Sequence, residues 1–580
     1  MENFEELRAC ASNWLSSDAL PLWIDRGYDD KFGLFYEKLD FSGRPLKTLP
    51  RRLMVQCRQL YVLAHLSLRG MYDSRALIDR TWQQVLRRFY RMDLPHRWAF
   101  SIGPDGEIHD GKCDSYTLAF LLFALAWLYR LKPDTAYLAL ADEVFTVLEG
   151  PLAANKGGVI DALPRPDGFL RQNPTMHLLE ACLALYESAR RPQDLARACA
   201  LHSNFSERML WRAQAALPEQ HDDDWKGEGI ADNWYEPGHH FEWAWLLRRF
   251  STLSGINVDD DVRVLLSRAE REGVDAEGFA IERIDILNGN PVGSRRSWGT
   301  CEYLKACAAE AEAKPADAGQ WRNKAAAALA ALQTGFLAIA PSGLWRDRID
   351  ANGQTLSTDV PASSLYHFVF ALMECERVFG RILRDPAAAT AEKAPALFLD
   401  RDGVINIDTR YPSKPEDITF VNGASDTVRL AQSRGYKVVV VSNQSGIARG
   451  YASEAQVMDL HRWMSERLHE KGAHVDAWYH CPFHDAAKRS AYRHEDHFDR
   501  KPNPGMILRA ALDLNIDLEQ SLLIGDNESD VTAASRAGVA GHLFKGENLF
   551  EFAQPLVGKS RPRPLHLSHP ITSRSDANHH

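Results

Sequence analysis

The stretch FLDRDGVIN at residues 398–406 decides the fold of the last third of this chain. The apolar run at 396–399 is typical of a short buried strand, and two aspartates one residue apart follow it. Because side chains alternate faces along a strand, Asp400 and Asp402 leave its end pointing the same way. Two such carboxylates would raise each other's pKa unless a cation lies between them, and Mg²⁺ prefers these oxygen ligands.

Three later segments also carry polar groups in short, turn-like stretches. The apolar run at 437–441 continues as SNQSGIARG at 442–450, where a hydroxyl and backbone N–H groups can cradle a phosphate. RKPNPGM at 500–506 places two cations before a proline-stiffened turn, and the run at 521–524 continues as GDNESD at 525–530. A loop serine, a solvated basic pair or a helix-capping aspartate would explain each segment alone, but not all four in this order.

The four segments resemble the haloacid dehalogenase phosphatase superfamily, and GIARGY and RKPNPGM resemble its D-glycero-D-manno-heptose 1,7-bisphosphate 7-phosphatases over about residues 394–550. The resemblance implies an α/β Rossmann-like domain with a minimal cap. Asp400 would form an aspartyl-phosphate, and Asp402 would act as general acid and base. Ser442 and Lys501 would hold the phosphoryl group, while Asp400, the Asp402 carbonyl and Asp526 would bind Mg²⁺. We expect further substrate contacts, including contacts to a second phosphate, from Asn443, Arg449 and Arg500.

The chain departs from this family's pattern at two places. Many members carry a zinc loop, in which a Cys-x-His pair is followed by a Cys-x-Cys pair. The corresponding segments here are CPFH at 481–484 and HFD at 497–499, so the candidate ligands are Cys481, His484, His497 and Asp499. Zinc could bind such a set, but we expect a loop without zinc that is packed by other means. Asn527 also stands where a lysine is common, which leaves the exact substrate open.

The first 380 residues have a helical apolar period almost throughout and contain a repeat. A loop that begins with glycine and an apolar residue and ends in aspartate recurs at 33–40, 278–285 and 343–350. Helices after such loops carry a polar residue on an apolar face. These residues are 58, 61, 65, 60 and 64 positions apart: Arg58, Tyr116, His177, Glu242, Glu302 and Tyr366. This period predicts an all-α (α/α)6 toroid with the polar residues inside, whereas a generic helical bundle predicts no regular period.

Histidines stand out among the polar residues expected inside the toroid. His177, His239 and His367 lie on three of the expected inner helices. A lone helical histidine is usually structural, but three at corresponding depth indicate acid–base chemistry near neutral pH. His239, His240 and Glu242 could suggest a metal site, yet adjacent residues of a helix point to different sides.

These motifs resemble the N-acylglucosamine 2-epimerase family, which includes mannose isomerases, over most of residues 10–380. The resemblance implies that His239 and His367 are the acid/base pair and that His177 assists ring opening or binding. A proton would leave the carbon next to a carbonyl, and its return to C1 is isomerisation, whereas its return to the opposite face of C2 is epimerisation. Gly299 and Thr300 replace a frequent Pro-Gln, so the sugar preference is not transferable. The sugar would be held by Arg58, Glu242, Trp298 and Glu302.

Length and composition fit a multidomain cytoplasmic protein. A chain of 580 residues is too long for one core, and a net charge of −10 argues against binding to nucleic acids or membrane surfaces. No apolar run reaches membrane-spanning length, and nine scattered cysteines are typical of reduced thiols. We expect the toroid at 1–384, a linker at 385–395, the phosphatase domain at 396–555 and a disordered tail at 556–580.

Together the two domains predict a bifunctional enzyme that acts on small-molecule sugar phosphates. The first would isomerise or epimerise a mannose-like sugar or its phosphate, and the second would hydrolyse a sugar bisphosphate with Mg²⁺. Two alternatives for the toroid stay open. It could be a non-catalytic carbohydrate-binding or regulatory module, or a glycosidase, which would need a carboxylate pair rather than histidines. The oligomeric state is also open, with a homodimer as one alternative.

Overall fold

The computed structural model describes residues 4–69, 71–72, 74–132, 134–384, 393–409, 411–489, 492–493, 497 and 499–558. The chain divides into two compact units, Met1–Ala391 and Glu392–His580. Most of the predicted linker and tail lies outside the described residues. The second unit extends beyond its predicted limits, because its first strand begins at Ala394 and Val557 packs in its core. None of the described helices combines the length and apolar character that a bilayer crossing requires.

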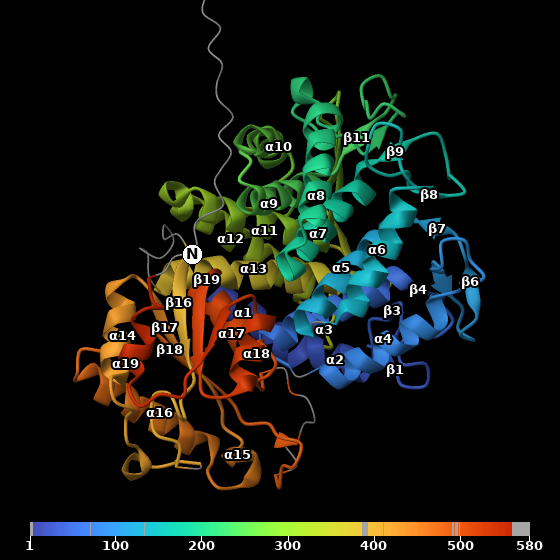
Figure 1. The fold of residues 1–580 in the computed structure, drawn as a ribbon. Helices are drawn as coiled ribbons and strands as arrows, with labels where there is room; N and C mark the ends of the chain where they lie inside the picture. Colours follow the sequence, from blue (N-terminus) through green and yellow to red (C-terminus); the bar gives the residue numbers. More distant parts are fainter. Residues whose placement is uncertain are drawn as a thin grey trace, which may run out of the picture. The chain divides into compact units, whose positions relative to one another are not determined.

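Within the described residues, six buried helices form the inner wall of the first unit (Figure 1). They are α3 (Leu53–Leu68), α5 (Ser115–Leu131), α7 (Gln172–Ala189), α9 (Pro237–Ser254), α11 (Ser297–Ala313) and α13 (Leu365–Arg384). Each contacts the next along the chain, and α13 contacts α3, so the wall closes into a ring. Every residue of α3 is buried, as expected for a helix that neighbours surround on all sides.

Amphipathic helices form the outer wall and pack against the inner ones. They are α4 (Arg75–Phe89), α6 (Thr135–Leu148), α8 (Pro192–Asn204), α10 (Asp259–Glu272), α12 (Ala318–Ala331) and α1 (Phe4–Asn13). On α4 the buried residues Ile78, Trp82, Val85 and Phe89 recur every three or four positions, which is the spacing of one helix face. The first helix, α1, packs on α12 and α13. The predicted (α/α)6 toroid is thereby confirmed, and its first and last helices meet.

A short strand leads into each of the six inner helices in the described chain. These strands are β4 (Arg51–Arg52), β7 (Cys113–Asp114), β9 (Leu170–Arg171), β11 (Trp234–Tyr235), β13 (Pro291–Arg296) and β15 (Val360–Pro361). They pair antiparallel with strands of other loops, as in the four-stranded sheet of β11, β12 (Ile281–Asp285), β13 and β14 (Arg348–Asp350). The first turns of the inner helices therefore gather at the strand-bearing end of the toroid.

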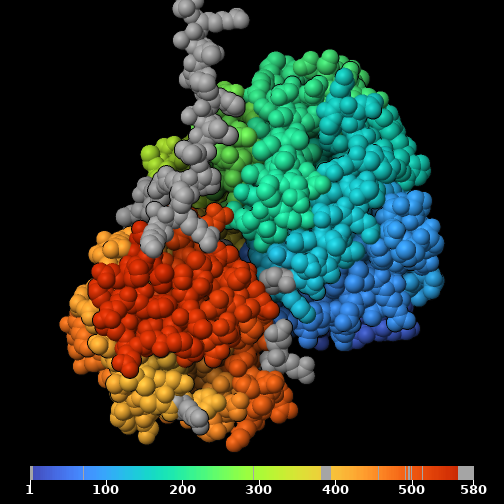
Figure 2. Space-filling view, viewed as in Figure 1, coloured from blue at the N-terminus to red at the C-terminus, as the bar shows by residue number. Residues whose placement is uncertain are grey.

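The second unit is built on a parallel sheet whose five strands have the order β18-β17-β16-β19-β20 within the described residues. Figure 2 shows the described residues of this unit (orange to red) as a closely packed surface. The strands are β16 (Ala394–Leu399), β17 (Lys437–Asn443), β18 (Ala477–Cys481), β19 (Ile516–Gly525) and β20 (Ala540–Leu543).

Helices cover both faces of this sheet. Leu397 and Leu399 of β16 join a core with α14 (Ala424–Ser433), α16 (Glu454–His469) and α19 (Leu549–Ala553). Ala396 and Phe398, which alternate with them, join a second core with α17 (Gly505–Leu514) and α18 (Glu528–Arg536). This is the predicted α/β architecture, in which ligands bind at the carboxyl ends of the strands.

Candidate active sites

The carboxyl ends of three neighbouring strands bring the predicted phosphatase residues together. Asp400 follows β16, Ser442 lies at the end of β17, and Asp526 follows β19. Lys501 comes from the loop before α17, and its ammonium lies 2.9 Å from a carboxylate oxygen of Asp400. The predicted nucleophile and the predicted phosphoryl-binding cation are therefore in direct contact.

A second buried carboxylate, that of Asp530, shares this lysine. The Lys501 ammonium lies 2.6 Å from Asp530 Oδ1 and donates to the carbonyl of Val441 at 2.8 Å. Burial raises the pKa of Asp400 to about 7, although Lys501 opposes the rise. Burial would lower the pKa of Lys501, but the two aspartates outweigh it and raise that pKa. The lysine therefore stays charged and compensates the buried carboxylates.

The carboxylates at this strand edge fit a magnesium ion. One oxygen from each of Asp400, Asp526 and Asp530 lies within 4.8 Å of the others, and Mg²⁺ prefers hard oxygen ligands of this kind. Burial also raises the pKa of Asp526. Gly403 has a φ of +82°, and a Cβ atom there would lie 2.3 Å from Oδ2 of Asp526, so only glycine fits beside this carboxylate.

Asp402 is fixed by three side-chain donors. Arg401 Nη2 donates to Asp402 Oδ2 at 2.8 Å, Gln444 Nε2 donates to the same oxygen at 2.9 Å, and Asn406 Nδ2 donates to Oδ1 at 3.0 Å. Gln444 Nε2 also donates to the hydroxyl of Ser442 at 2.8 Å. The glutamine thus ties the predicted general acid to the predicted phosphoryl-binding serine.

The three further substrate contacts expected from the sequence have different outcomes. Asn443 Nδ2 donates to the carbonyl of Lys501 at 2.9 Å, and its Oδ1 accepts from the Lys501 N–H at 3.0 Å. Its amide therefore positions the Lys501 backbone, and its contact with a substrate stays a prediction. Arg449 Nη2 lies 3.0 Å from Nε2 of His484, and Arg500 Nη1 donates to the carbonyl of Phe483 at 3.2 Å. Both arginines are anchored to the loop after β18.

The loop predicted to lack zinc brings two of its four candidate ligands together. Sγ of Cys481 lies 3.8 Å from Nδ1 of His497, and the ring of Phe483 stacks on His497 with centroids 3.8 Å apart. The other two candidates have arginine partners, since His484 contacts Arg449 and Asp499 pairs with Arg509. Among the described residues, close groups of three or more metal-binding side chains do not include this set. A loop without zinc stays a prediction.

In the first unit, two histidine–carboxylate pairs lie next to Trp298. Nδ1 of His239, on α9, is 2.8 Å from Glu219 Oε1, and Nδ1 of His367, on α13, is 2.7 Å from Glu302 Oε1. The Trp298 ring centroid lies 5.0 Å from that of His239 and 5.7 Å from that of His367. Because each carboxylate engages Nδ1, Nε2 is the nitrogen left for chemistry in both rings.

The two histidines differ in proton affinity. Burial lowers the pKa of His367 well below its ordinary value. Burial acts in the same direction on His239, but Glu219 and the neighbouring carboxylates outweigh it and raise the pKa of His239 to about 9. At neutral pH the His239 ring is therefore a charged imidazolium and the His367 ring is a neutral imidazole. This is the arrangement of an acid and a base.

His177 and Arg58 lie at the same end of the toroid. Nδ1 of His177 is 2.9 Å from Glu180 Oε2, and the hydroxyl of Tyr366 donates to the other oxygen of Glu180 at 2.5 Å. Arg58 Nη2 donates to the hydroxyl of Tyr116 at 2.7 Å. Burial lowers the pKa of His177 to about 3, so its ring is neutral. The structure thus assembles polar residues that the sequence places about sixty positions apart.

His240 is structural, as the geometry of adjacent helical residues predicts. Its Nε2 accepts a hydrogen bond from the Leu217 N–H at 2.9 Å, and its Nδ1 lies 3.1 Å from the carbonyl of Leu265. Both ring nitrogens are therefore committed to the backbone, and His239, His240 and Glu242 do not form a shared metal site.

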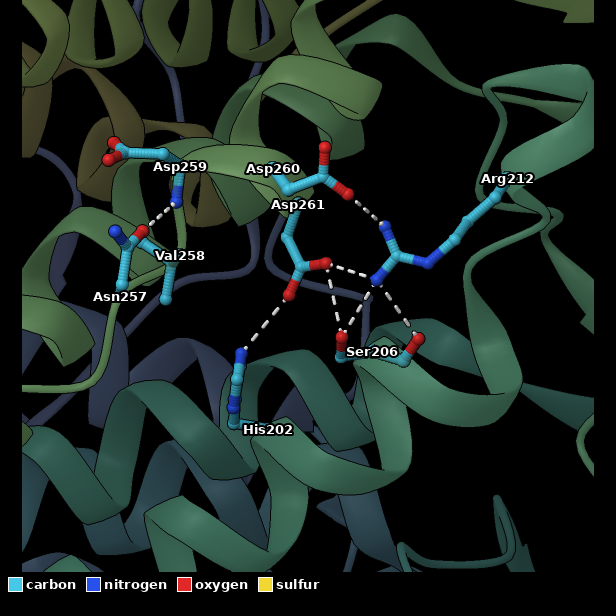
Figure 3. A pocket seen from close by; sticks show the side chains of 8 residues that line it. All are labelled: His202, Ser206, Arg212, Asn257, Val258, Asp259, Asp260 and Asp261. Carbon is cyan, nitrogen blue, oxygen red and sulfur yellow. Dashed lines mark hydrogen bonds and ion pairs between the residues drawn. The ribbon is translucent and has the colours of Figure 1, made fainter. Parts of the chain in front are cut away.

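A surface cavity at the beginning of α10 lies outside both candidate sites (Figure 3). Four of its charged or titratable side chains form one network: His202, Arg212, Asp260 and Asp261. Nε2 of His202 is 3.2 Å from Asp261 Oδ2, the hydroxyl of Ser206 donates to Asp261 Oδ1 at 3.1 Å, and Arg212 pairs with Asp260 at 3.0 Å. This network holds the segment after α8 against the beginning of α10. A role in stabilising the fold is sufficient to explain these contacts.

Relatives of the first unit are known. The model of the N-acylglucosamine 2-epimerase (GlcNAc 2-epimerase) family matches residues 33–371. The mannose-6-phosphate isomerase of Rhizobium meliloti is 32% identical over 392 residues, which cover 64% of this chain and 97% of that protein. The chain belongs to the N-acylglucosamine 2-epimerase family. The cellobiose 2-epimerase structure from Spirochaeta thermophila shares the fold, with a TM-score of 0.58 and 20% identity over 66% of this chain and 98% of that one.

The second unit of this epimerase-family chain has relatives of its own. A HAD-hydrolase-like family model matches residues 498–548. The D-glycero-beta-D-manno-heptose-1,7-bisphosphate 7-phosphatase of Rhodopseudomonas palustris is 42% identical over 170 residues, which cover 29% of this chain and 93% of that protein. The chain therefore joins an epimerase-type unit to a phosphatase-type unit, as the sequence predicts.

Sequence reasoning missed several partner residues in this epimerase-family chain. Asp530 is the second aspartate of the GDNESD segment, and its place in the first turn of α18 was the available signal. Lys305 follows Glu302 by three positions, so the two share a helix face. Glu219 lies in a loop outside the repeat, and no periodicity points to it. Glu180 follows His177 by three positions on α7.

Proposed function

We propose that this chain is a bifunctional sugar enzyme with a separate active site in each unit. The second unit would release phosphate from a sugar bisphosphate of the heptose type. The first would interconvert an aldose and a ketose, or two 2-epimers, of a mannose-like sugar or its phosphate. The substrates named for the relatives of the two units support these assignments. The proposal also places the enzyme in the cytoplasm, where sugar phosphates are found.

In the second unit, Asp400 would attack the phosphorus and form an aspartyl-phosphate while Asp402 protonates the leaving sugar oxygen. Asp402 would then take a proton from water, whose oxygen attacks the phosphorus and frees Asp400. Lys501 and Ser442 would hold the phosphoryl oxygens throughout. Mg²⁺, held by Asp400, Asp526, the Asp402 carbonyl and the nearby Asp530, would neutralise negative charge on the phosphoryl group when bound.

In the first unit, one of His239 and His367 would remove the C2 proton of the open-chain aldose while the other protonates the C1 oxygen. The resulting enediol becomes a ketose when C1 gains a proton and the C2 hydroxyl loses one. Reprotonation of C2 on the opposite face, with loss of the C1 hydroxyl proton back to the enzyme, gives the epimer instead. His177 would assist ring opening or binding, and Arg58, Glu242, Trp298 and Glu302 would hold the sugar.

The observation that carries the proposal is that each unit holds its own buried reactive groups. Asp400 contacts Lys501 in one unit, and His239 and His367 both lie next to Trp298 in the other. A phosphatase with a non-catalytic toroid would not need two histidines with opposite proton affinities.

The proposal is tested with the full-length protein and a panel of sugars. The panel contains heptose 1,7-bisphosphate, mannose 6-phosphate, fructose 6-phosphate and free mannose, and both phosphate release and sugar identity are measured. We expect phosphate release from the bisphosphate with Mg²⁺ and interconversion of at least one mannose-type substrate. Phosphate release without interconversion of any sugar would instead favour a carbohydrate-binding toroid.

A further inference from the structure

A buried lysine stands behind one of the two histidine–carboxylate pairs of the first unit. Lys305, on α11, is fully buried. Its Nζ lies 2.6 Å from Oε2 of Glu302 and 3.9 Å from Oε1 of Glu242. The other oxygen of Glu302, Oε1, is the one that lies 2.7 Å from Nδ1 of His367. The Glu302 carboxylate therefore bridges an ammonium group and an imidazole ring.

The surroundings of Lys305 keep it charged. Burial would lower its pKa, but Glu302 and Glu242 outweigh this effect and raise the pKa of the lysine. The rings of Trp245 and Phe370 also lie close, each with its centroid 4.4 Å from Nζ, and an ammonium is attracted to such ring faces. Without Lys305, Glu302 and Glu242 would be two buried carboxylates without a compensating cation in contact.

The second pair has a neutral group in the corresponding place. The carboxylate of Glu219, which contacts His239 through Oε1, accepts a hydrogen bond at Oε2 from the side-chain amide of Gln172 at 3.1 Å. A neutral amide weakens the negative charge of a carboxylate less than an ammonium does. Glu219 therefore stabilises a protonated His239 more than Glu302 stabilises a protonated His367.

Charged groups of both signs surround His367, and the positive ones act in the same direction as Lys305. The groups that face it are Arg58 of α3, His177 of α7, Glu242 of α9, Glu302 and Lys305 of α11, and Arg296 of β13. The two arginines and the lysine are positive, so they oppose protonation of the ring. Lys305 differs from the arginines because it contacts the carboxylate that orients His367.

We propose that Lys305 is a positioning residue that makes His367 the proton acceptor of the pair. The charged lysine, 2.6 Å from Glu302, favours the ionised carboxylate, which accepts a hydrogen bond from Nδ1–H of His367. The lone pair of the ring then lies on Nε2, which takes the C2 proton, while protonated His239 gives its proton to the C1 oxygen. This assignment rests on the sugar interconversion proposed above.

Removal of Lys305 would reverse this tautomer. Burial and Glu242 raise the pKa of Glu302 well above its ordinary value, and Lys305 limits this rise. A protonated Glu302 would donate its proton to Nδ1 of His367 instead of accepting one. The ring would then carry its hydrogen on Nε2 and could not act as a base there.

The first test observes the histidine directly, without substrate. The full-length protein is labelled with ¹⁵N-histidine, and the His367 signals are assigned by their loss in His367→Asn. We expect a neutral ring with hydrogen on Nδ1 between about pH 6 and pH 8. A protonated ring or an Nε2–H tautomer at neutral pH would overturn the proposal. This result is independent of whether any sugar is interconverted, so it separates failure of the inference from failure of the proposed function.

The second test replaces the lysine by a side chain of similar length without charge. For Lys305→Met we expect kcat/KM for sugar interconversion to fall about 10- to 10³-fold at neutral pH. Because Glu302 must be ionised, the acidic limb of the pH–rate profile should move to higher pH. In Lys305→Met/Glu302→Gln the amide oxygen can again accept from Nδ1–H, so part of the lost activity should return.

A matched control removes another cation from the same toroid. Arg377, on α13, pairs with Glu312 and Glu374, so Arg377→Met should lower thermal stability without moving the acidic limb. If Lys305→Met keeps the wild-type rate and pH profile, the lysine does not set the state of His367. A uniform loss of rate at every pH, as in a merely structural defect, would also contradict the proposal.

Discussion

In each unit one buried lysine compensates two carboxylates, but the chemistry that the lysine supports differs between the units. Lys501 lies between Asp400 and Asp530 beside a third carboxylate, and this cluster can take up a metal ion. Lys305 lies between Glu302 and Glu242, and the group that it influences is a histidine. A lysine–carboxylate pair can therefore support covalent catalysis or proton transfer. Which of the two it supports depends on the group beside the carboxylate, a metal site in one unit and a histidine in the other.

The largest effect should come from the proposed nucleophile of the second unit. Asp400→Asn removes the oxygen that attacks phosphorus, so we expect phosphate release to fall by about 10³-fold or more. Sugar interconversion by the first unit should be unchanged, and both activities are measured on the same preparation. Phosphate release that survives the substitution would show that the nucleophile is another residue.

The corresponding change in the first unit should produce the opposite pattern. His367→Asn or His239→Asn should lower sugar interconversion by about 10²- to 10⁴-fold, the usual contribution of a general acid or base, and leave phosphate release unchanged. His240→Asn is the matched control, since its ring nitrogens contact backbone groups, and it should mainly lower thermal stability. Sugar interconversion at the wild-type rate by both single variants would show that these histidines are not the acid and base. It would favour the toroid as a binding module.

Magnesium should stabilise the second unit in a pH-dependent manner. The pKa of Asp400 is about 7 in the folded protein, above its ordinary 3.8. The native state thus binds the extra proton between these values, and stability without metal falls as pH rises through this window. Metal binding needs the ionised carboxylates, so added Mg²⁺ should raise the melting temperature more at about pH 8 than at about pH 6. Calorimetry checks this, and Asp526→Asn should abolish the increase.

The smallest effect concerns the loop after β18. Treatment with a zinc-selective chelator, with Mg²⁺ then restored, should leave phosphate release unchanged, because His484 and Asp499 already pair with arginines. Elemental analysis of the purified protein provides the direct measurement. Stoichiometric zinc that disappears in Cys481→Ser would show that the loop closes around a metal after all.

The sequence predicted the second site more completely than the first for a topological reason. Asp400, Ser442 and Asp526 each end a strand of one parallel sheet, so strand recognition alone places them together. In the first unit the period located Arg58 and His177 on inner helices, and these elements were confirmed. The period could not reveal Glu219, which comes from a loop. In the second unit, the strand pattern did not reveal that the amide of Asn443 binds the Lys501 backbone.

Ring closure has a consequence for how the chain is made. α1 leaves the ribosome before α12 and α13, on which it packs and which emerge more than 300 residues later. α13 also supplies His367 and the contact with α3 that completes the inner wall. The first unit therefore cannot finish folding during synthesis until translation has reached the second. Shortening the ring from either end would open it.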